Sequence, residues 1–270
     1  MRYRFISDSH IHSDCSFDGN DSVMMLSERA AALGYYSITV TDHCECDVYY
    51  KDSYDKTVEQ SFFETRKAKA VFRDRLAVFN GIELGQPLYD LGAAEDALSK
   101  CDFDFVLGSV HNLRDKKDFY YLNYNEENVP ALLNAYFDEL ISLSQWSGID
   151  SLAHLTYPLR YIVGGYQITV NLKNYWDKIE TILKNLAKNG KALEVNTSGL
   201  RQVIGVTMPD FDVVARFKEL GGRYVTLGSD AHRWADVGSC IEDGLMLLRK
   251  AGFNHFTVYE KRRPVLLPIE

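Results

Sequence analysis

The chain has 270 residues, 46% of them hydrophobic and 25% charged, which is enough apolar material for one large domain or two small ones. Its formal net charge of −8 argues against general binding to nucleic acid or to an anionic membrane surface. No run of about 18 apolar residues occurs, so we expect no membrane span and no secretory signal in residues 1–10. The five cysteines form no disulfide framework, which predicts free thiols and a cytoplasmic location.

Short runs of β-branched and aromatic residues alternate along the chain with longer amphipathic segments. The short runs predict seven strands, at 3–7, 36–41, 77–84, 103–110, 151–155, 192–197 and 224–229. The longer segments predict helices at 22–34, 61–75, 129–148, 174–190, 209–222 and 238–252. The tail at 253–267 is a candidate eighth strand, although no helix follows it.

Repeated strand-then-helix units with nearly continuous apolar strands are typical of a closed parallel α/β barrel rather than an antiparallel sandwich. No linker or low-complexity tract divides the chain, so we expect a single domain over 1–270. The polar stretches 45–57 and 114–128 follow the second and fourth strands and predict long loops on one face of the barrel.

Polar side chains, most of them able to bind metal ions, lie at or just after the ends of the predicted strands. His10 and His12 are one residue apart, a spacing that in a strand points both side chains the same way. The wider set, in chain order, is Asp8, His10, His12, Asp18, Asp42, His43, Glu83, His111, His154, Asn196, Arg201, Asp230 and His232. The carboxyl ends of parallel barrel strands meet on one face, where active sites form. Of the seven histidines, six lie at these strand ends; His255 does not, and we expect it to be structural.

Some members of the set have explanations other than membership of this metal site. His154 lies in an apolar run and could be a core histidine, and Cys44 with Cys46 could bind zinc, although no second cysteine pair completes a site. Glu83 is different, because an unpaired carboxylate within a buried strand is costly and a cation would remove that cost. Asp8 and Asp42 are expected to orient histidines rather than to bind metal.

The chemistry of this set indicates a multinuclear metal site. Mixed imidazole and carboxylate ligands suit Zn²⁺, Mn²⁺ or Fe²⁺, and at roughly three or four ligands per ion the set supports two or three ions. Neighbouring cations can hold a phosphoryl group and supply hydroxide at neutral pH. No P-loop and no G-x-S-x-G motif occurs, so the expected nucleophile is a metal-bridging hydroxide rather than a side chain.

The motifs DSHIHS, TDH, GIE, GSVH, LAHL and GSDAH, in this order, resemble those of the PHP family (polymerase and histidinol phosphatase). The segments SVHNL, YPLRY and EVNTSGLR are most similar to the histidinol-phosphate phosphatases of that family. The resemblance implies a distorted seven-stranded, TIM-like (β/α)₇ barrel with three divalent ions. It also implies hydrolysis of L-histidinol phosphate to L-histidinol and phosphate, a step of histidine biosynthesis, by in-line attack of the bridging hydroxide.

The resemblance carries over a ligand set, residue by residue. It implies one ion bound by His10, His12, Glu83 and Asp230, a second by Glu83, His111 and His154, and a third by Asp18, His43 and His232. Some members have histidine at the position of Asp18, and the harder carboxylate alters the metal preference expected there. Arg160 and Arg201 follow the fifth and sixth strands, and we expect them to bind the phosphate. Asp230, His232 and metal-bound water are the candidates for assisting the leaving alkoxide, and the sequence does not choose among them.

Three other functions stay open at this point. A phosphodiesterase of the same family could act on a nucleotide or a cyclic phosphodiester. An amidohydrolase-type barrel would need a carboxylated lysine after the fourth strand, and none is found there. A non-catalytic, metal-stabilised binding domain is disfavoured because the ligand set is complete. The expected partner is a small phosphate ester, with no nucleic acid and no membrane.

Overall fold

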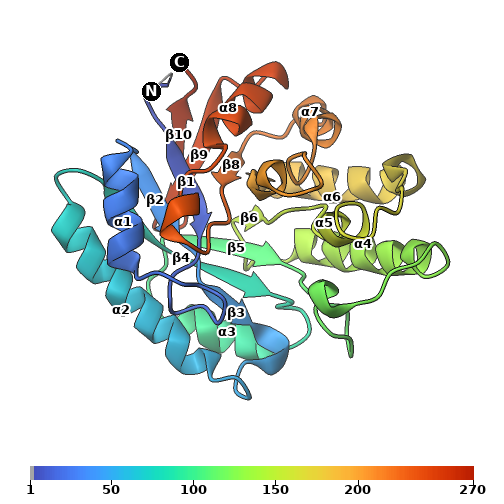
Figure 1. Ribbon diagram of the computed structural model, residues 1–270, viewed down its shortest axis with the longest axis horizontal. Coiled ribbons are helices and arrows are strands. Elements are labelled where there is room, and N and C mark those ends of the chain that lie inside the picture. Colours follow the sequence, from blue (N-terminus) through green and yellow to red (C-terminus); the bar gives the residue numbers. More distant parts are fainter. Residues whose placement is uncertain (1–2) are drawn as a thin grey trace.

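The computed structural model describes residues 3–270, and within them seven parallel strands form a barrel (Figure 1). Around the barrel the strands are β1 (Ser7–Ile11), β2 (Ser37–Val40), β4 (Ala77–Gly85), β5 (Phe105–Ser109), β6 (Ser151–Leu152), β7 (Ala192–Asn196) and β8 (Val225–Gly228). A parallel bridge between Ile11 and Ala231 joins the first strand to the end of the last. The expected seven-stranded α/β barrel is therefore confirmed.

Helices lie around the outside of the strands, as Figure 1 shows. They are α1 (Val23–Ala32), α2 (Tyr54–Phe72), α3 (Leu91–Lys100), α4 (Val129–Gln145), α5 (Leu159–Ile162), α6 (Trp176–Lys188), α7 (Phe211–Glu219) and α8 (Ile241–Lys250). Short 3₁₀ helices occur at Cys46–Val48, Phe119–Tyr121, Leu172–Tyr175, Ser198–Arg201 and Trp234–Asp236. In α6 the apolar residues recur every three or four positions, and Ile179, Ile182, Leu183 and Leu186 are all buried.

A short extra strand follows β2, where the sequence predicted the start of a long loop. β3 (His43–Glu45) pairs in parallel with β4 and sets His43 opposite Glu83. Within the predicted loop, Cys46–Val48 forms a 3₁₀ helix and α2 already begins at Tyr54, which leaves only a turn at 49–53. The prediction of a loop over 45–57 was wrong for this reason.

Other boundaries also differ from the predictions. β1 lies at Ser7–Ile11 instead of 3–7, and it was missed because four of its five residues are polar although all five are buried. β6 ends at Leu152, so His154 lies just beyond the strand. The helix α3 was not predicted; its buried residues are the small side chains Ala93, Ala94 and Ala97.

The chain tail forms an antiparallel hairpin of β9 (His255–Glu260) and β10 (Arg263–Pro268), in a separate sheet from the barrel. The candidate eighth barrel strand was therefore wrong. The Lys261 N–H donates to Asp104, and Arg262 donates to Asp150, both of which directly precede barrel strands. The hairpin thus covers the amino ends of β5 and β6, and His255 lies exposed on it, far from the polar strand ends.

One hydrophobic cluster extends through the described chain from Tyr3 to Ile269. Within residues 3–270, none of the helices is both long enough and apolar enough to cross a membrane.

Candidate metal centre

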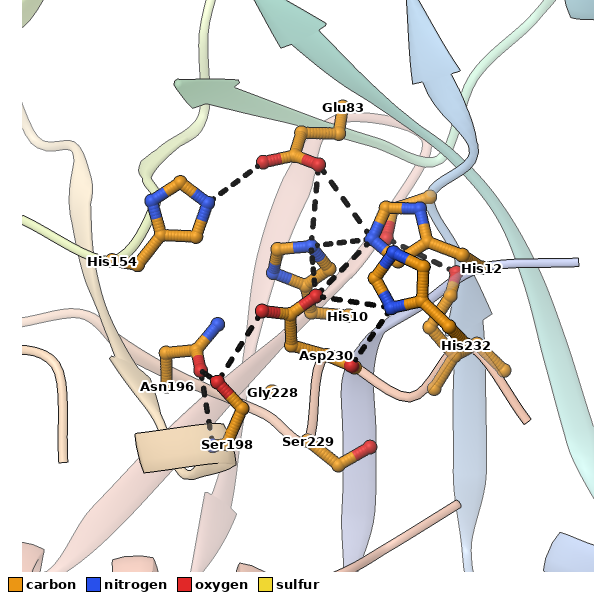
Figure 2. A network of polar contacts seen from close by, with 12 residues as sticks. His10, His12, Glu83, His154, Asn196, Ser198, Gly228, Ser229, Asp230 and His232 are labelled. Carbon is orange, nitrogen blue, oxygen red and sulfur yellow. Dashed lines mark hydrogen bonds and ion pairs between the residues drawn. The ribbon is translucent and has the colours of Figure 1, made fainter. Parts of the chain in front are cut away.

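The carboxyl ends of the barrel strands bring all nine predicted ligands together. They are His10, His12, Asp18, His43, Glu83, His111, His154, Asp230 and His232. Figure 2 shows six of them: His10, His12, Glu83, His154, Asp230 and His232. His10 and Glu83 are fully buried, whereas the side chains of Asp18 and His232 are 39% and 26% exposed. The cluster therefore has a closed inner part and one side that opens to solvent.

The first group of ligand atoms surrounds the two histidines of β1 and its end. The Nε2 atoms of His10 and His12 lie 2.9 Å apart. Oε2 of Glu83 is 3.4 and 3.6 Å from these nitrogens, and Oδ1 of Asp230 is 3.8 and 3.5 Å from them. An irregularity in the pairing of β1 with β2, between Asp8 and Ile11, distorts the strand here. The four side chains thus enclose a position for one cation.

The second group lies on the other oxygen of Glu83. Its Oε1 is 3.0 Å from Nε2 of His154 and 3.2 Å from Nε2 of His111. The two histidine nitrogens are 3.5 Å apart. Glu83 therefore presents one carboxylate oxygen to each group, which is the geometry of a bridging ligand.

The third group is the most exposed. Nε2 of His232 lies 3.0 Å from Oδ2 of Asp18, and Nε2 of His43 lies 3.7 Å from Oδ1. Burial raises the pKa of Asp18, but His232 and His43 outweigh it and lower that pKa to about 2. The His12 ring stacks on both His43 and His232, with centroids 4.2 Å apart in each pair. The third group is thus in direct contact with the first.

Two of the inner groups, Glu83 and His12, are already in the protonation state that metal binding needs. Burial raises the pKa of Glu83, but His111, His10 and His43 together hold it well below its usual value, so the bridging carboxylate is ionised. Burial and the neighbouring His232 and His43 lower the pKa of His12, which leaves that imidazole neutral. An anionic bridge and a neutral imidazole are the states that a cation needs.

The residues also fit a cation on hydrogen-bonding grounds. Within the described residues, the buried atoms Glu83 Oε2 and His43 Nδ1 have no hydrogen-bond partner, although they lie only 3.1 Å apart. An unsatisfied buried polar group costs about 1–3 kcal/mol, and more if it is charged. A divalent ion between the carboxylate and the surrounding nitrogens would remove this cost.

Asp8 and Asp42 act on histidines only indirectly: Asp8 accepts from the backbone N–H of His10 at 3.4 Å, and Asp42 reaches the His12 ring through Ser16. Asp8 accepts hydrogen bonds from the N–H groups of Ser229 and Gly238, so it holds the loop after β8 against β1. Asp42 accepts from Ser13 and Ser16 and meets His12 only through the Ser16 hydroxyl. In residues 3–270 neither carboxylate contacts an imidazole directly. A carboxylate and a histidine that are close in sequence do not have to face each other.

Two other glutamates, which the sequence reasoning missed, make those contacts. Oε1 of Glu194 lies 2.6 Å from Nδ1 of His10, and Oε1 of Glu45 lies 2.9 Å from Nδ1 of His111. A signal for Glu194 was available, because it sits in the apolar strand ALEVN as Glu83 sits in GIELG.

Both arginines that were expected to bind phosphate lie beside Asp230. Arg160 Nη2 donates to Asp230 Oδ2 at 3.0 Å and to Ser198 Oγ at 2.6 Å. Arg201 donates to the backbone carbonyls of Ser229 and Asp230, at 2.6 and 2.9 Å. Asp230 has a φ of 54°, an uncommon conformation for a residue with a side chain, and such strain gathers at functional sites. Arg201 therefore supports the strained loop that presents Asp230.

Comparisons with known proteins agree with the resemblance drawn from the motifs. A model of the PHP domain matches residues 8–198. A probable histidinol-phosphatase from Thermotoga maritima is 30% identical over 260 residues, which are 94% of this chain and 96% of that protein. A histidinol-phosphatase from Lactococcus lactis subsp. lactis is 29% identical over 261 residues, 93% of each chain.

A solved structure extends the likeness to three dimensions. It is the crystal structure of histidinol phosphate phosphatase from Lactococcus lactis subsp. lactis, complexed with Zn, L-histidinol and phosphate. It is similar to this chain with a TM-score of 0.78 and 26% identity, and the match covers 96% of this chain and 98% of that one.

Proposed function

Because this chain belongs to the PHP domain family, we propose that it is a metal-dependent phosphatase that hydrolyses L-histidinol phosphate to L-histidinol and phosphate. The observation that carries the proposal is the bridging position of Glu83, with His111 and His154 at one carboxylate oxygen and His10, His12 and His43 at the other. The relatives named as histidinol-phosphatases match almost the whole chain, which supports the same substrate. The domain proposed for this activity is the single PHP-type domain over 1–270.

The proposed centre has three divalent ions, of Zn, Mn or Fe. The Zn of the Lactococcus lactis complex supports zinc as one of them. The ligands proposed for the first ion are His10, His12, Glu83 and Asp230; for the second, Glu83, His111 and His154; and for the third, Asp18, His43 and His232. When bound, the cations supply Lewis acidity and lower the pKa of water, so that hydroxide is available near neutral pH.

The side chains around the centre bind and orient the ester. Arg160 and Arg201 lie on the Asp230 side, and we assign them to the phosphoryl oxygens, for which a guanidinium is well matched. His232 and Asp230 are the candidates for assisting the leaving alkoxide. Burial raises the pKa of Asp230, but His10, His12 and Arg160 hold it well below its usual value. An ionised Asp230 is a poor proton donor, which favours His232.

The test is phosphate release from L-histidinol phosphate by protein loaded with Zn²⁺ or Mn²⁺, with sugar phosphates assayed beside it. Selective turnover of L-histidinol phosphate, lost in Glu83→Gln, is the expected result. Turnover of another ester instead, such as a nucleotide or a cyclic phosphodiester, would change the substrate but not the chemistry. Tight metal binding without turnover of any ester would favour a non-catalytic binding domain.

The remaining parts of the proposal concern the setting of the enzyme. The expected partner is the small phosphate ester itself. The cytoplasmic location expected from the cysteine pattern is proposed with it, and the structure has Cys15, Cys44, Cys46, Cys101 and Cys240 as free thiols.

A further inference from the structure

One buried carboxylate contacts two of the proposed metal ligands at once. Glu194, in β7, is 1% exposed. Its Oε1 lies 2.6 Å from Nδ1 of His10, and its Oε2 accepts a hydrogen bond of 2.7 Å from the backbone N–H of His154. His10 belongs to the first group of ligands and His154 to the second. A single side chain therefore connects both groups from outside the centre.

The two contacts have different effects. An anionic acceptor at Nδ1 of His10 keeps the proton on that nitrogen and directs the lone pair of Nε2 toward Glu83 and Asp230. At His154, by contrast, Glu194 fixes the backbone N–H and does not contact the imidazole ring. His154 follows β6, a strand of only two residues, so the sheet provides little support at this point. Glu194 thus orients a ring in one group and positions a main chain in the other.

The barrel makes room for this carboxylate by having no side chain at Gly228. A Cβ at Gly228 would lie 2.4 Å from Glu194 Oε1 and 2.4 Å from the Cβ of His10. Gly228 ends β8 and is drawn together with His10 and Asp230 in Figure 2. The close contact between Glu194 and His10 therefore depends on glycine at this position.

We propose that Glu194 is a positioning residue that couples the first and second metal positions and has no direct contact with the ligands of the third. It contacts His10 and His154 but makes no hydrogen bond or ion pair with Asp18, His43 or His232 in the described chain. This inference rests on the proposed metal centre and adds to it a prediction about which ions are lost together.

The substitution Glu194→Gln tests the idea without changing the size of the side chain. His10 Nδ1 and the backbone N–H of His154 both act as donors to Glu194, as does the Asn196 amide at 3.4 Å, and a carboxylate can accept from all of them. A glutamine has one acceptor oxygen and one NH₂ group, so its oxygen can serve either His10 or the His154 N–H, but not both. At the other contact the glutamine NH₂ group faces another N–H donor, so that hydrogen bond is lost.

The experiment compares zinc binding to metal-free wild type and to the metal-free Glu194→Gln variant, by calorimetry with a competing chelator. Anomalous diffraction from zinc-soaked crystals assigns the occupancy of each position. We expect the first and second positions to bind roughly 10–100-fold more weakly in the variant, the range for loss of a group that orients a ligand. The third position should keep its affinity, and the metal-free variant should unfold at the same temperature as metal-free wild type.

Glu45→Gln is the matched control, because Glu45 contacts His111 and His43 but neither His10 nor His154 in the described structure. It should weaken the second and third positions and leave the first intact. Gly228→Ala is an independent variant that keeps the carboxylate but pushes it from His10, and it should reproduce the paired loss at the first and second positions.

Unchanged affinity at the first two positions in both Glu194→Gln and Gly228→Ala would overturn the inference. Equal loss at all three positions, with a lower unfolding temperature of the metal-free protein, would also overturn it in favour of a general structural role. If wild type bound no zinc, the proposed centre itself would be wrong, a result distinct from the other two.

Discussion

Arg160 and Asp230 form an ion pair, with Arg160 Nη2 3.0 Å from Oδ2 of the carboxylate. The other oxygen of Asp230, Oδ1, lies 3.5 Å from Nε2 of His12. One carboxylate therefore connects the arginine proposed to bind phosphate with the first group of ligands. The arginine side chain is 14% exposed, so its position is set by these partners and not by solvent.

Replacing Arg160 tests this connection. Arg160→Lys keeps the positive charge but loses the planar group that spans Asp230 and Ser198. Hydrogen bonds to charged groups contribute about 1.5–3 kcal/mol, so we expect kcat/KM for L-histidinol phosphate to fall roughly 10–100-fold. Steady-state kinetics measures it, and Arg216→Lys, at a surface ion pair with Glu180, is the control. An unchanged kcat/KM would remove Arg160 from the substrate site.

Glu83 is the residue whose loss should be most severe. Glu83→Gln removes the bridging charge between the first and second groups, so metal content and activity should fall together. Metal analysis and phosphate release on the same sample provide the measurement. Full activity with an intact metal content would refute the bridging role. Glu139→Gln, on the partly exposed side of α4, is a suitable control outside the centre.

Metal affinity should increase with pH. Burial lowers the pKa of His111 in the metal-free protein, but the carboxylates of Glu45 and Glu83 outweigh it and raise that pKa to about 10. At neutral pH this histidine therefore carries a proton that a cation must displace. Below that pKa, each proton released makes the apparent affinity rise by about tenfold per pH unit.

Calorimetry in buffers of different ionisation enthalpy counts the protons released on zinc binding. We expect at least one at neutral pH, and fewer as the pH approaches the pKa of His111. An affinity that stayed constant between about pH 6 and pH 9 would contradict this prediction.

Removing the metal should destabilise the fold, because ions that bind only the folded state add to its stability. The free energy of unfolding increases by about 2.7 kcal/mol for one site at a ligand concentration 100 times its Kd. Chelation should therefore lower the midpoint of urea unfolding, and added zinc should restore it. A midpoint that does not depend on zinc would show that the folded and unfolded chains bind it equally.

The sequence by itself determined the type of barrel and the set of candidate ligands that the barrel brings together. Period-two and near-continuous apolar runs reflect local burial, and they placed most of the parallel strands to within a few residues. The histidines could be assigned to one face because strand ends in a parallel barrel converge, whatever the exact register. Glu83 stood out for a local reason as well, since a carboxylate inside an apolar strand needs a partner.

Only the tertiary structure decided which carboxylate faces which histidine. His10 and Glu194 are 184 positions apart in the chain, and no local pattern reports their contact. The expected partners Asp8 and Asp42 instead hold loop residues, while β3 brings His43 opposite Glu83. Such pairings depend on strand register and on the space left at Gly228, and these arise only when distant strands pack together.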